Sequence, residues 1–362
     1  MDNNQNYNSR SPFEEYYEFF PSLEDEKKAR KTFSRLSLSV FVFLLISSVA
    51  MYAILYVVEF ILINTAPGLI NLLLNDPSFN FILSYVSMYC IALPVLVLIV
   101  RKMEVYKPQK RKMSFIEFIV VYCIATAVMF LGNIIGQILN SVISSLIKKE
   151  ITNGVEDMIF ETPMWLIVLV VVFIGPIVEE LIFRKLMIDR LSKYGDVLAI
   201  TFSSVAFGLF HGNFYQFFYA TAVGFVLGYV YTKTRSMKLS ALLHMIINFF
   251  GSVVALFITK LNEEYTVLFE RFEAGEELAT AEEAKLSLYS MIISGYSLFD
   301  LLVVAAGVVL LIVVFSKRMI KLQNRGLVRL DEHQAVKLSV VNVGSILFLI
   351  LSIALFVISI IV

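Results

Sequence analysis

The segment GPIVEELIFR, residues 175–184, places two carboxylates and one guanidinium at the end of the apolar run MWLIVLVVVFIGPIV. Charged side chains inside hydrocarbon are costly, and those that occur there usually pair with one another or mark functional sites. Glu180 and Arg184 are one helical turn apart with the acid on the N-terminal side, which is the favoured order for an ion pair. Glu179 points about 100° away around the helix. This spacing predicts that Glu180 and Arg184 neutralise each other, and that Glu179 faces the interior of the bundle and is available for proton transfer.

Two of the three histidines also lie in apolar stretches. His211 ends SSVAFGLFHG, one turn after Phe207, and His244 lies in SALLHMIINF, one turn before Asn248. One histidine in a membrane helix is ordinarily explained by a hydrogen bond between helices. Two histidines, an unpaired glutamate and an asparagine within 70 residues favour a functional site instead.

Taken in order, the motifs EELIFR (EExxxR), FGLFH (FxxxH) and HMIIN (HxxxN) resemble the motif set of the CPBP family of intramembrane proteases. That family includes the CAAX prenyl endopeptidases and the bacterial Abi-type proteins. The resemblance covers about residues 164–255, a quarter of the chain. It implies that the protein hydrolyses a peptide bond of a peptide or a membrane-protein substrate.

The resemblance also suggests a role for each motif residue. We expect Glu179, aided by His211, to deprotonate a water molecule, because a partly desolvated carboxylate suits a general base. His244 and Asn248 are expected to donate hydrogen bonds to the developing oxyanion. Glu180, Arg184 and Phe207 are expected to hold the helices and orient the substrate.

Zinc binding at this site is an alternative hypothesis. Glu179, His211 and His244 could ligate the ion, with water as the fourth ligand. No HExxH segment supplies a preformed pair of ligands, so no cofactor is assured. A serine nucleophile is disfavoured because no Ser-His-Asp constellation is readable.

Two other classes of function remain. A scaffold or bacteriocin-immunity protein could keep the fold without catalysis, although it would not need Glu179 together with both histidines. A proton-coupled transporter could use the same polar cluster as a relay, but inverted repeats and matched broken helices are not evident.

The elements that must position these residues are membrane helices. Of the 362 residues, 58% are hydrophobic, the mean hydropathy is +0.79, and the apolar residues lie in blocks of about 20, the length that crosses a bilayer. We therefore predict an all-α, polytopic transmembrane bundle. About nine spans are expected: 36–64, 80–100, 115–147, 164–187, 196–212, 215–232, 239–259, 289–315 and 338–362.

The basic residues orient this topology. With the N-terminus in the cytoplasm, 25 of the 30 lysines and arginines fall on the cytoplasmic side. The resulting division is a polar cytoplasmic tail (1–35), N-terminal helices (36–163), a catalytic four-helix core (164–259), an acidic extracytoplasmic segment (260–288) read as a surface helix or hairpin, and a C-terminal two-span region (289–362). We expect a bacterial plasma-membrane protein with a site open to the cytoplasm, in contact with lipid and with no nucleic-acid partner.

Overall fold

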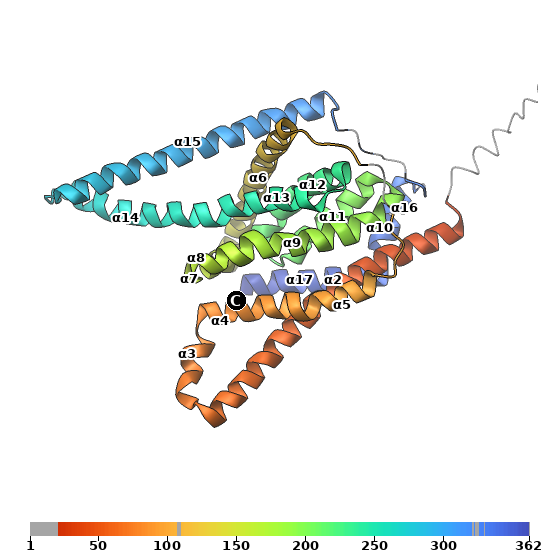
Figure 1. The fold of residues 1–362 in the computed structure, drawn as a ribbon, viewed down its shortest axis with the longest axis horizontal. Coiled ribbons are helices and arrows are strands. Elements are labelled where there is room, and N and C mark those ends of the chain that lie inside the picture. The colour runs from red at the N-terminus through yellow and green to blue at the C-terminus, as the bar shows by residue number, and fades with distance from the viewer. Residues whose placement is uncertain (1–20, 107–109, 321, 323–325, 329, 362) are drawn as a thin grey trace, which may run out of the picture.

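The computed structural model describes residues 21–106, 110–320, 322, 326–328 and 330–361, and within these residues the chain forms helices and no strand (Figure 1). The predicted all-α class is confirmed. The first half of the chain contains α2 (Leu23–Thr65), η1 (Pro67–Leu69), α3 (Ile70–Leu74), α4 (Pro77–Val86), η2 (Ser87–Ala92), α5 (Leu93–Val100), α6 (Phe115–Ile147) and α7 (Gly154–Glu161).

The second half begins with the helix that carries the paired carboxylates. Its elements are α8 (Met164–Leu166), η3 (Ile167–Ile174), α9 (Gly175–Glu179), η4 (Glu180–Ile188), α10 (Asp189–Leu191), η5 (Ser192–Tyr194), α11 (Asp196–Phe210), α12 (Phe214–Thr234), α13 (Met237–Asn248), η6 (Phe249–Val254), α14 (Ala255–Glu273), α15 (Thr280–Ser316), α16 (Glu332–Val340) and α17 (Val343–Ile361). Of the η segments, η1 and η5 are 3₁₀ turns, and the other four are π-helical stretches that continue a longer helix.

Seven helical stretches among the described residues are long and apolar enough to cross a membrane, so the chain is an integral membrane protein. They are Leu23–Thr65, Pro77–Val100, Phe115–Ile147, Met164–Tyr194, Met237–Glu273, Thr280–Ser316 and Val343–Ile361. The count of nine is not confirmed. The expected span 196–212 corresponds to α11, whose 15 residues reach only about 22 Å at 1.5 Å each. The expected span 215–232 corresponds to α12, which is not among the seven.

The start of the first helix differs from the expected boundary at residue 36. Helix α2 begins at Leu23, within the polar segment, because Ser22 and Asp25 form a capping box at its N-terminus. The hydroxyl of Ser22 accepts a hydrogen bond from the backbone N–H of Asp25 at 3.1 Å. The expected tail is therefore helical from Leu23 onward, and its residues 1–20 lie outside the described residues.

The acidic segment 260–288 forms a helical hairpin, which was one of the two forms expected for it. Helices α14 and α15 continue from their apolar parts and meet at a short turn, forming the long arm in Figure 1. Arg271 of α14 contacts Glu276 in the turn and Glu282 of α15, each at 2.8 Å.

Close packing of three helices sets the position of the motif residues. Helix α12 lies between α11 and α6, and both neighbours contact it through glycines. A methyl group on Gly132 of α6 would lie 2.5 Å from the Cα of Tyr219, and one on Gly208 of α11 would lie 2.8 Å from the carbonyl oxygen of Phe217. Gly208 thus permits the close approach that its small size predicts. Gly212 instead adopts a left-handed turn, with φ +67°, between α11 and α12.

Candidate active site

Helix α9–η4 presents the two glutamates after an irregular segment. Pro176 has no backbone N–H, so a carbonyl of the preceding π-helical stretch η3 loses its donor. The side-chain amide of Asn248, on α13, donates to the carbonyl oxygen of Val171 at 2.9 Å. Pro176 and Asn248 therefore tie the helix of Glu179 to the helix of His244.

Glu180 and Arg184 form the ion pair that their spacing predicts. Nε of Arg184 lies 3.3 Å from Oε2 of Glu180, and both side chains are 0% exposed. Nη1 of Arg184 donates to the hydroxyl of Ser203 at 3.1 Å, and that hydroxyl donates to the carbonyl oxygen of Phe183 at 2.7 Å. Ser203 is thus engaged in a structural bond, which agrees with the absence of a readable serine nucleophile.

His244 lies between the two carboxylates. Its Nδ1 is 3.3 Å from Oε1 of Glu180, and its Nε2 is 3.5 Å from Oε2 of Glu179. The two glutamates differ in accessibility, because the side chain of Glu179 is 19% exposed and that of Glu180 is 0% exposed. Glu180 is therefore a fixed partner of Arg184 and His244, whereas Glu179 is the carboxylate that keeps exposed surface.

Phe207 brings the second histidine to the same place. Its ring centroid lies 4.8 Å from that of His211 and 5.7 Å from that of His244, and both imidazoles meet it edge to face. The guanidinium of Arg184 lies 5.1 Å from the centroid of the same ring. The three motifs, which are up to 70 residues apart in sequence, converge on this one aromatic ring.

A hydrogen bond orients the ring of His211. Nδ1 of His211 is 2.8 Å from the carbonyl oxygen of Phe207, and since a carbonyl can only accept, Nδ1 carries the hydrogen. In the neutral imidazole Nε2 then has a free lone pair. Asn213, the N-cap of α12, fixes the turn by donating to the carbonyl oxygen of His211 at 3.0 Å.

The fit of these residues to zinc is incomplete. The nitrogen of His244 and the oxygen of Glu179 are close enough to share an ion, but catalytic zinc takes three protein ligands. Among the residues that the structure describes, no three histidine, cysteine, aspartate or glutamate side chains are grouped to hold a metal. His211 does not complete the set.

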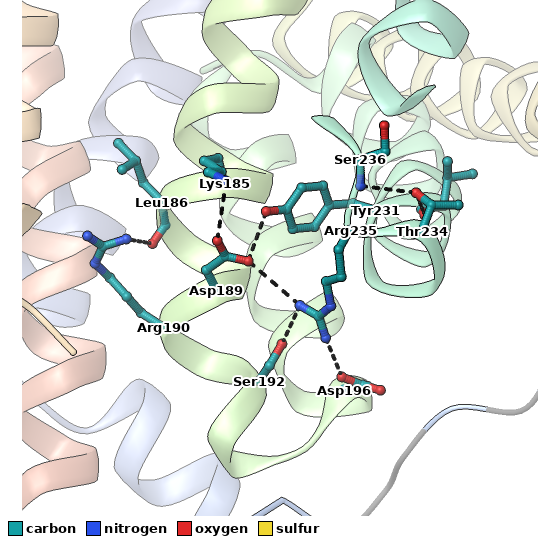
Figure 2. A network of polar contacts seen from close by, with 11 residues as sticks. Lys185, Leu186, Asp189, Arg190, Ser192, Asp196, Tyr231, Thr234, Arg235 and Ser236 are labelled. Atoms are coloured by element: carbon teal, nitrogen blue, oxygen red, sulfur yellow. Dashed lines mark hydrogen bonds and ion pairs between the residues drawn. The ribbon is translucent and has the colours of Figure 1, made fainter. Parts of the chain in front are cut away.

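A second buried network, which the sequence did not suggest, holds the far end of the same helix (Figure 2). The hydroxyl of Tyr231 donates to Oδ1 of Asp189 at 2.8 Å. Arg235 lies 3.7 Å from that oxygen and donates to Asp196 at 3.2 Å and to the hydroxyl of Ser192 at 3.1 Å. These contacts join η4–α10, α11 and α12. No helical spacing reveals them, because they cross between elements.

The loop before α6 is tied to this network. The backbone N–H of Tyr106 donates to the carbonyl oxygen of Asp189 at 2.8 Å. Lys193 donates to Glu104 at 3.0 Å, and this hydrogen bond lowers the pKa of the Glu104 carboxyl. The end of the helix that carries the site is thus fixed on several sides.

Tyrosines near Glu179 were also missed from the sequence. A methyl group on Gly175, one turn before Glu179, would lie 3.4 Å from the hydroxyl oxygen of Tyr89, whose ring lies 5.4 Å from that of Tyr85. Tyr85 and Tyr89 lie on the helix α4–η2–α5, far from the motifs in sequence. A tyrosine in an apolar span is ordinarily explained by packing. The sequence therefore gives no sign of this proximity, which only the folded arrangement reveals.

Comparison with known proteins supports the resemblance. Residues 161–250 match the family described as Type II CAAX prenyl endopeptidase Rce1-like. A Bacillus subtilis (strain 168) protein named "Putative membrane peptidase YdiL" is 33% identical over 110 residues, which are 30% of this chain and 44% of that protein. The chain therefore aligns with less than half the length of this relative. No solved structure matches the chain.

Proposed function

We propose that this chain, whose residues 161–250 match the Type II CAAX prenyl endopeptidase Rce1-like family, is an intramembrane endopeptidase that hydrolyses a peptide bond with a water activated by Glu179. The observation that carries the proposal is the position of His244, which contacts both the partly exposed Glu179 and the ring of Phe207 that also contacts His211. The substrate is a peptide or a membrane-protein segment.

In this mechanism Glu179 accepts a proton from water, and the lone pair on Nε2 of His211 holds the water. The oxygen of the water bonds to the scissile carbonyl carbon. Collapse of the tetrahedral intermediate breaks the C–N bond, and the proton on Glu179 passes to the leaving nitrogen. Glu180 holds His244 through Nδ1, so that the other ring nitrogen stays beside Glu179.

The proposed reaction needs no step through a metal ion. The zinc set of Glu179, His211 and His244 is the competing proposal. Sensitivity of cleavage to chelators distinguishes the two. The proposed location is a bacterial plasma membrane, with the site reached from the cytoplasm, as the distribution of basic residues indicates.

The direct test uses the full-length protein in liposomes. Two probes are added, a farnesylated peptide ending in Cys-aliphatic-aliphatic-X and an unmodified proteome-derived peptide library, and products are identified by mass spectrometry. New cleavage products that are absent with Glu179→Gln would support the proposal. Identical product patterns would contradict it and favour the scaffold or immunity alternative.

The same liposomes test the transporter alternative. A pH-sensitive dye inside the vesicles reports proton movement across the membrane. Proton uptake that depends on Glu179, without cleavage of either probe, would replace the protease by a proton-coupled transporter.

A further inference from the structure

The two side chains expected to donate to the oxyanion are both engaged elsewhere. The ring nitrogens of His244 face Glu180 and Glu179 at 3.3 and 3.5 Å. The amide of Asn248 donates to the carbonyl oxygen of Val171, which leaves a single N–H of that amide uncommitted. Since oxyanion donors must be aimed at the developing charge before the reaction, the site calls for another donor.

The hydroxyl of Tyr89 lies beside the face of α9 that carries Glu179. A methyl group built on Gly175 would be 3.4 Å from this hydroxyl oxygen. Glu179 follows Gly175 by one helical turn, so the two residues share one face of the helix. The hydroxyl therefore lies against the helix surface at Gly175, one turn before the accessible carboxylate.

The ring of Tyr89 is held in place, but its hydroxyl is uncommitted. The rings of Tyr85 and Tyr89 lie 5.4 Å apart, and Phe81 continues this stack at 4.7 Å from Tyr85. Among the residues that the structure describes, none forms a hydrogen bond with the Tyr89 hydroxyl. The residue is only partly buried. A phenol that is fixed by packing, keeps exposed surface and lacks a protein partner is suited to bind a ligand group.

The local backbone also sets this position apart. Tyr89 lies in the π-helical stretch Ser87–Ala92. The other π-helical stretches, at 167–174, 180–188 and 249–254, contain or adjoin Val171, Glu180 and Asn248. Such stretches frequently occur at functional sites. Tyr89 thus lies in a π-helical stretch like those beside the motif residues, although it is outside the region 161–250 that matches the protease family.

We infer that the Tyr89 hydroxyl donates a hydrogen bond to the carbonyl oxygen of the scissile peptide bond. This inference rests on the proposed function. As the water oxygen bonds to the carbonyl carbon and its proton passes to Glu179, the C=O electron pair moves onto the oxygen. The hydrogen bond from Tyr89 stabilises that negative charge, and the phenol keeps its own proton throughout. Glycine at 175 lets the phenol hydroxyl approach the helix of Glu179 closely.

The test compares Tyr89→Phe with the wild-type protein in liposomes, using the farnesylated peptide and the peptide library as probes. Phenylalanine keeps the ring stack and removes only the hydroxyl. Loss of one oxyanion donor is expected to lower kcat by about 10²-fold, with KM nearly unchanged, because the bond strengthens in the transition state. The matched control is Tyr122→Phe. It removes the hydroxyl of a tyrosine whose ring centroid lies 6.2 Å from that of Phe250. We expect this control to keep wild-type kcat.

The outcomes separate the inference from the proposed function. An active wild-type protein with unchanged kcat in Tyr89→Phe would overturn the inference alone. A rise in KM at constant kcat would also overturn it, since that pattern reports ground-state binding rather than oxyanion stabilisation. A wild-type protein that cleaves neither probe would overturn both. Equal thermal unfolding temperatures of the two tyrosine variants would confirm that folding is not the cause.

Discussion

Nε2 of His244 lies 3.5 Å from Oε2 of Glu179. The contact joins α13 to the end of α9, two helices separated by more than 50 residues in sequence. It places an imidazole directly beside the one carboxylate of the EELIFR motif that has exposed surface. Predictions about chemistry therefore concern Glu179 and the histidines, whereas predictions about stability concern the buried groups around them.

Glu180→Gln should destabilise the protein. The substitution leaves the guanidinium of Arg184 buried at 0% exposure without its carboxylate, and breaking a buried ion pair costs about 3–5 kcal/mol. We expect a lower unfolding temperature in detergent. In molecules that remain folded, activity should fall less than in Glu179→Gln. The exposed pair of Glu24 and Lys28 supplies the control, because Glu24→Gln should change the unfolding temperature little. An unchanged unfolding temperature in Glu180→Gln would contradict the structural role.

Asn248→Ala should reduce stability as well as activity. It leaves the carbonyl oxygen of Val171 without its donor, and an unsatisfied buried acceptor costs about 1–3 kcal/mol. Thermal unfolding measures this change. Asn64→Ala removes an equivalent amide-to-carbonyl bond at an exposed position and should be nearly neutral. If Asn248→Ala loses activity with no loss of stability, the bond to Val171 is dispensable and Asn248 acts on the substrate alone.

His211→Ala should lower the rate of cleavage with little effect on stability. Its ring holds the attacking water in the proposed mechanism, and such assistance contributes about 10²–10⁴-fold to rate. Initial rates with the peptide probes measure the loss. His333→Ala, on the exposed helix α16, should leave the rate unchanged. Full activity in His211→Ala would remove this residue from the mechanism.

Chelation of metal ions should not reduce cleavage. Among the described residues, no three histidine, cysteine, aspartate or glutamate side chains are grouped so that they could hold an ion. The proposed base is the carboxylate of Glu179. Purified protein is treated with 1,10-phenanthroline, dialysed, and assayed with the same probes. Loss of activity that zinc restores would establish the alternative in which Glu179, His211 and His244 are ligands.

The sequence predicts local relationships well, because helical geometry alone decides them. The pairing of Glu180 with Arg184 follows from residue spacing and is confirmed. The convergence of the three motifs depends on how different helices pack, which the spacing within one helix does not determine. The ring of Phe207 provides it by contacting both His211 and His244.

Contacts between distant elements could not be predicted. Tyr89 and the bonds of Arg235 depend on which helices become neighbours, and no periodicity carries that information. The hydropathy of the sequence did not predict the number of membrane spans either. Helix α11 is apolar but has only 15 residues, so an apolar block in the sequence does not distinguish a short helix packed in the bundle from a crossing.

The most direct test of the account is the rate at which Glu179→Gln cleaves the peptide probes, relative to the wild-type protein and to Glu59→Gln. Glu59 is an exposed carboxylate on another membrane helix, so its substitution controls for the loss of one charge. The account predicts no detectable product with Glu179→Gln, and wild-type rates with Glu59→Gln. Equal cleavage by the wild-type and Glu179→Gln proteins would contradict a water activated by Glu179.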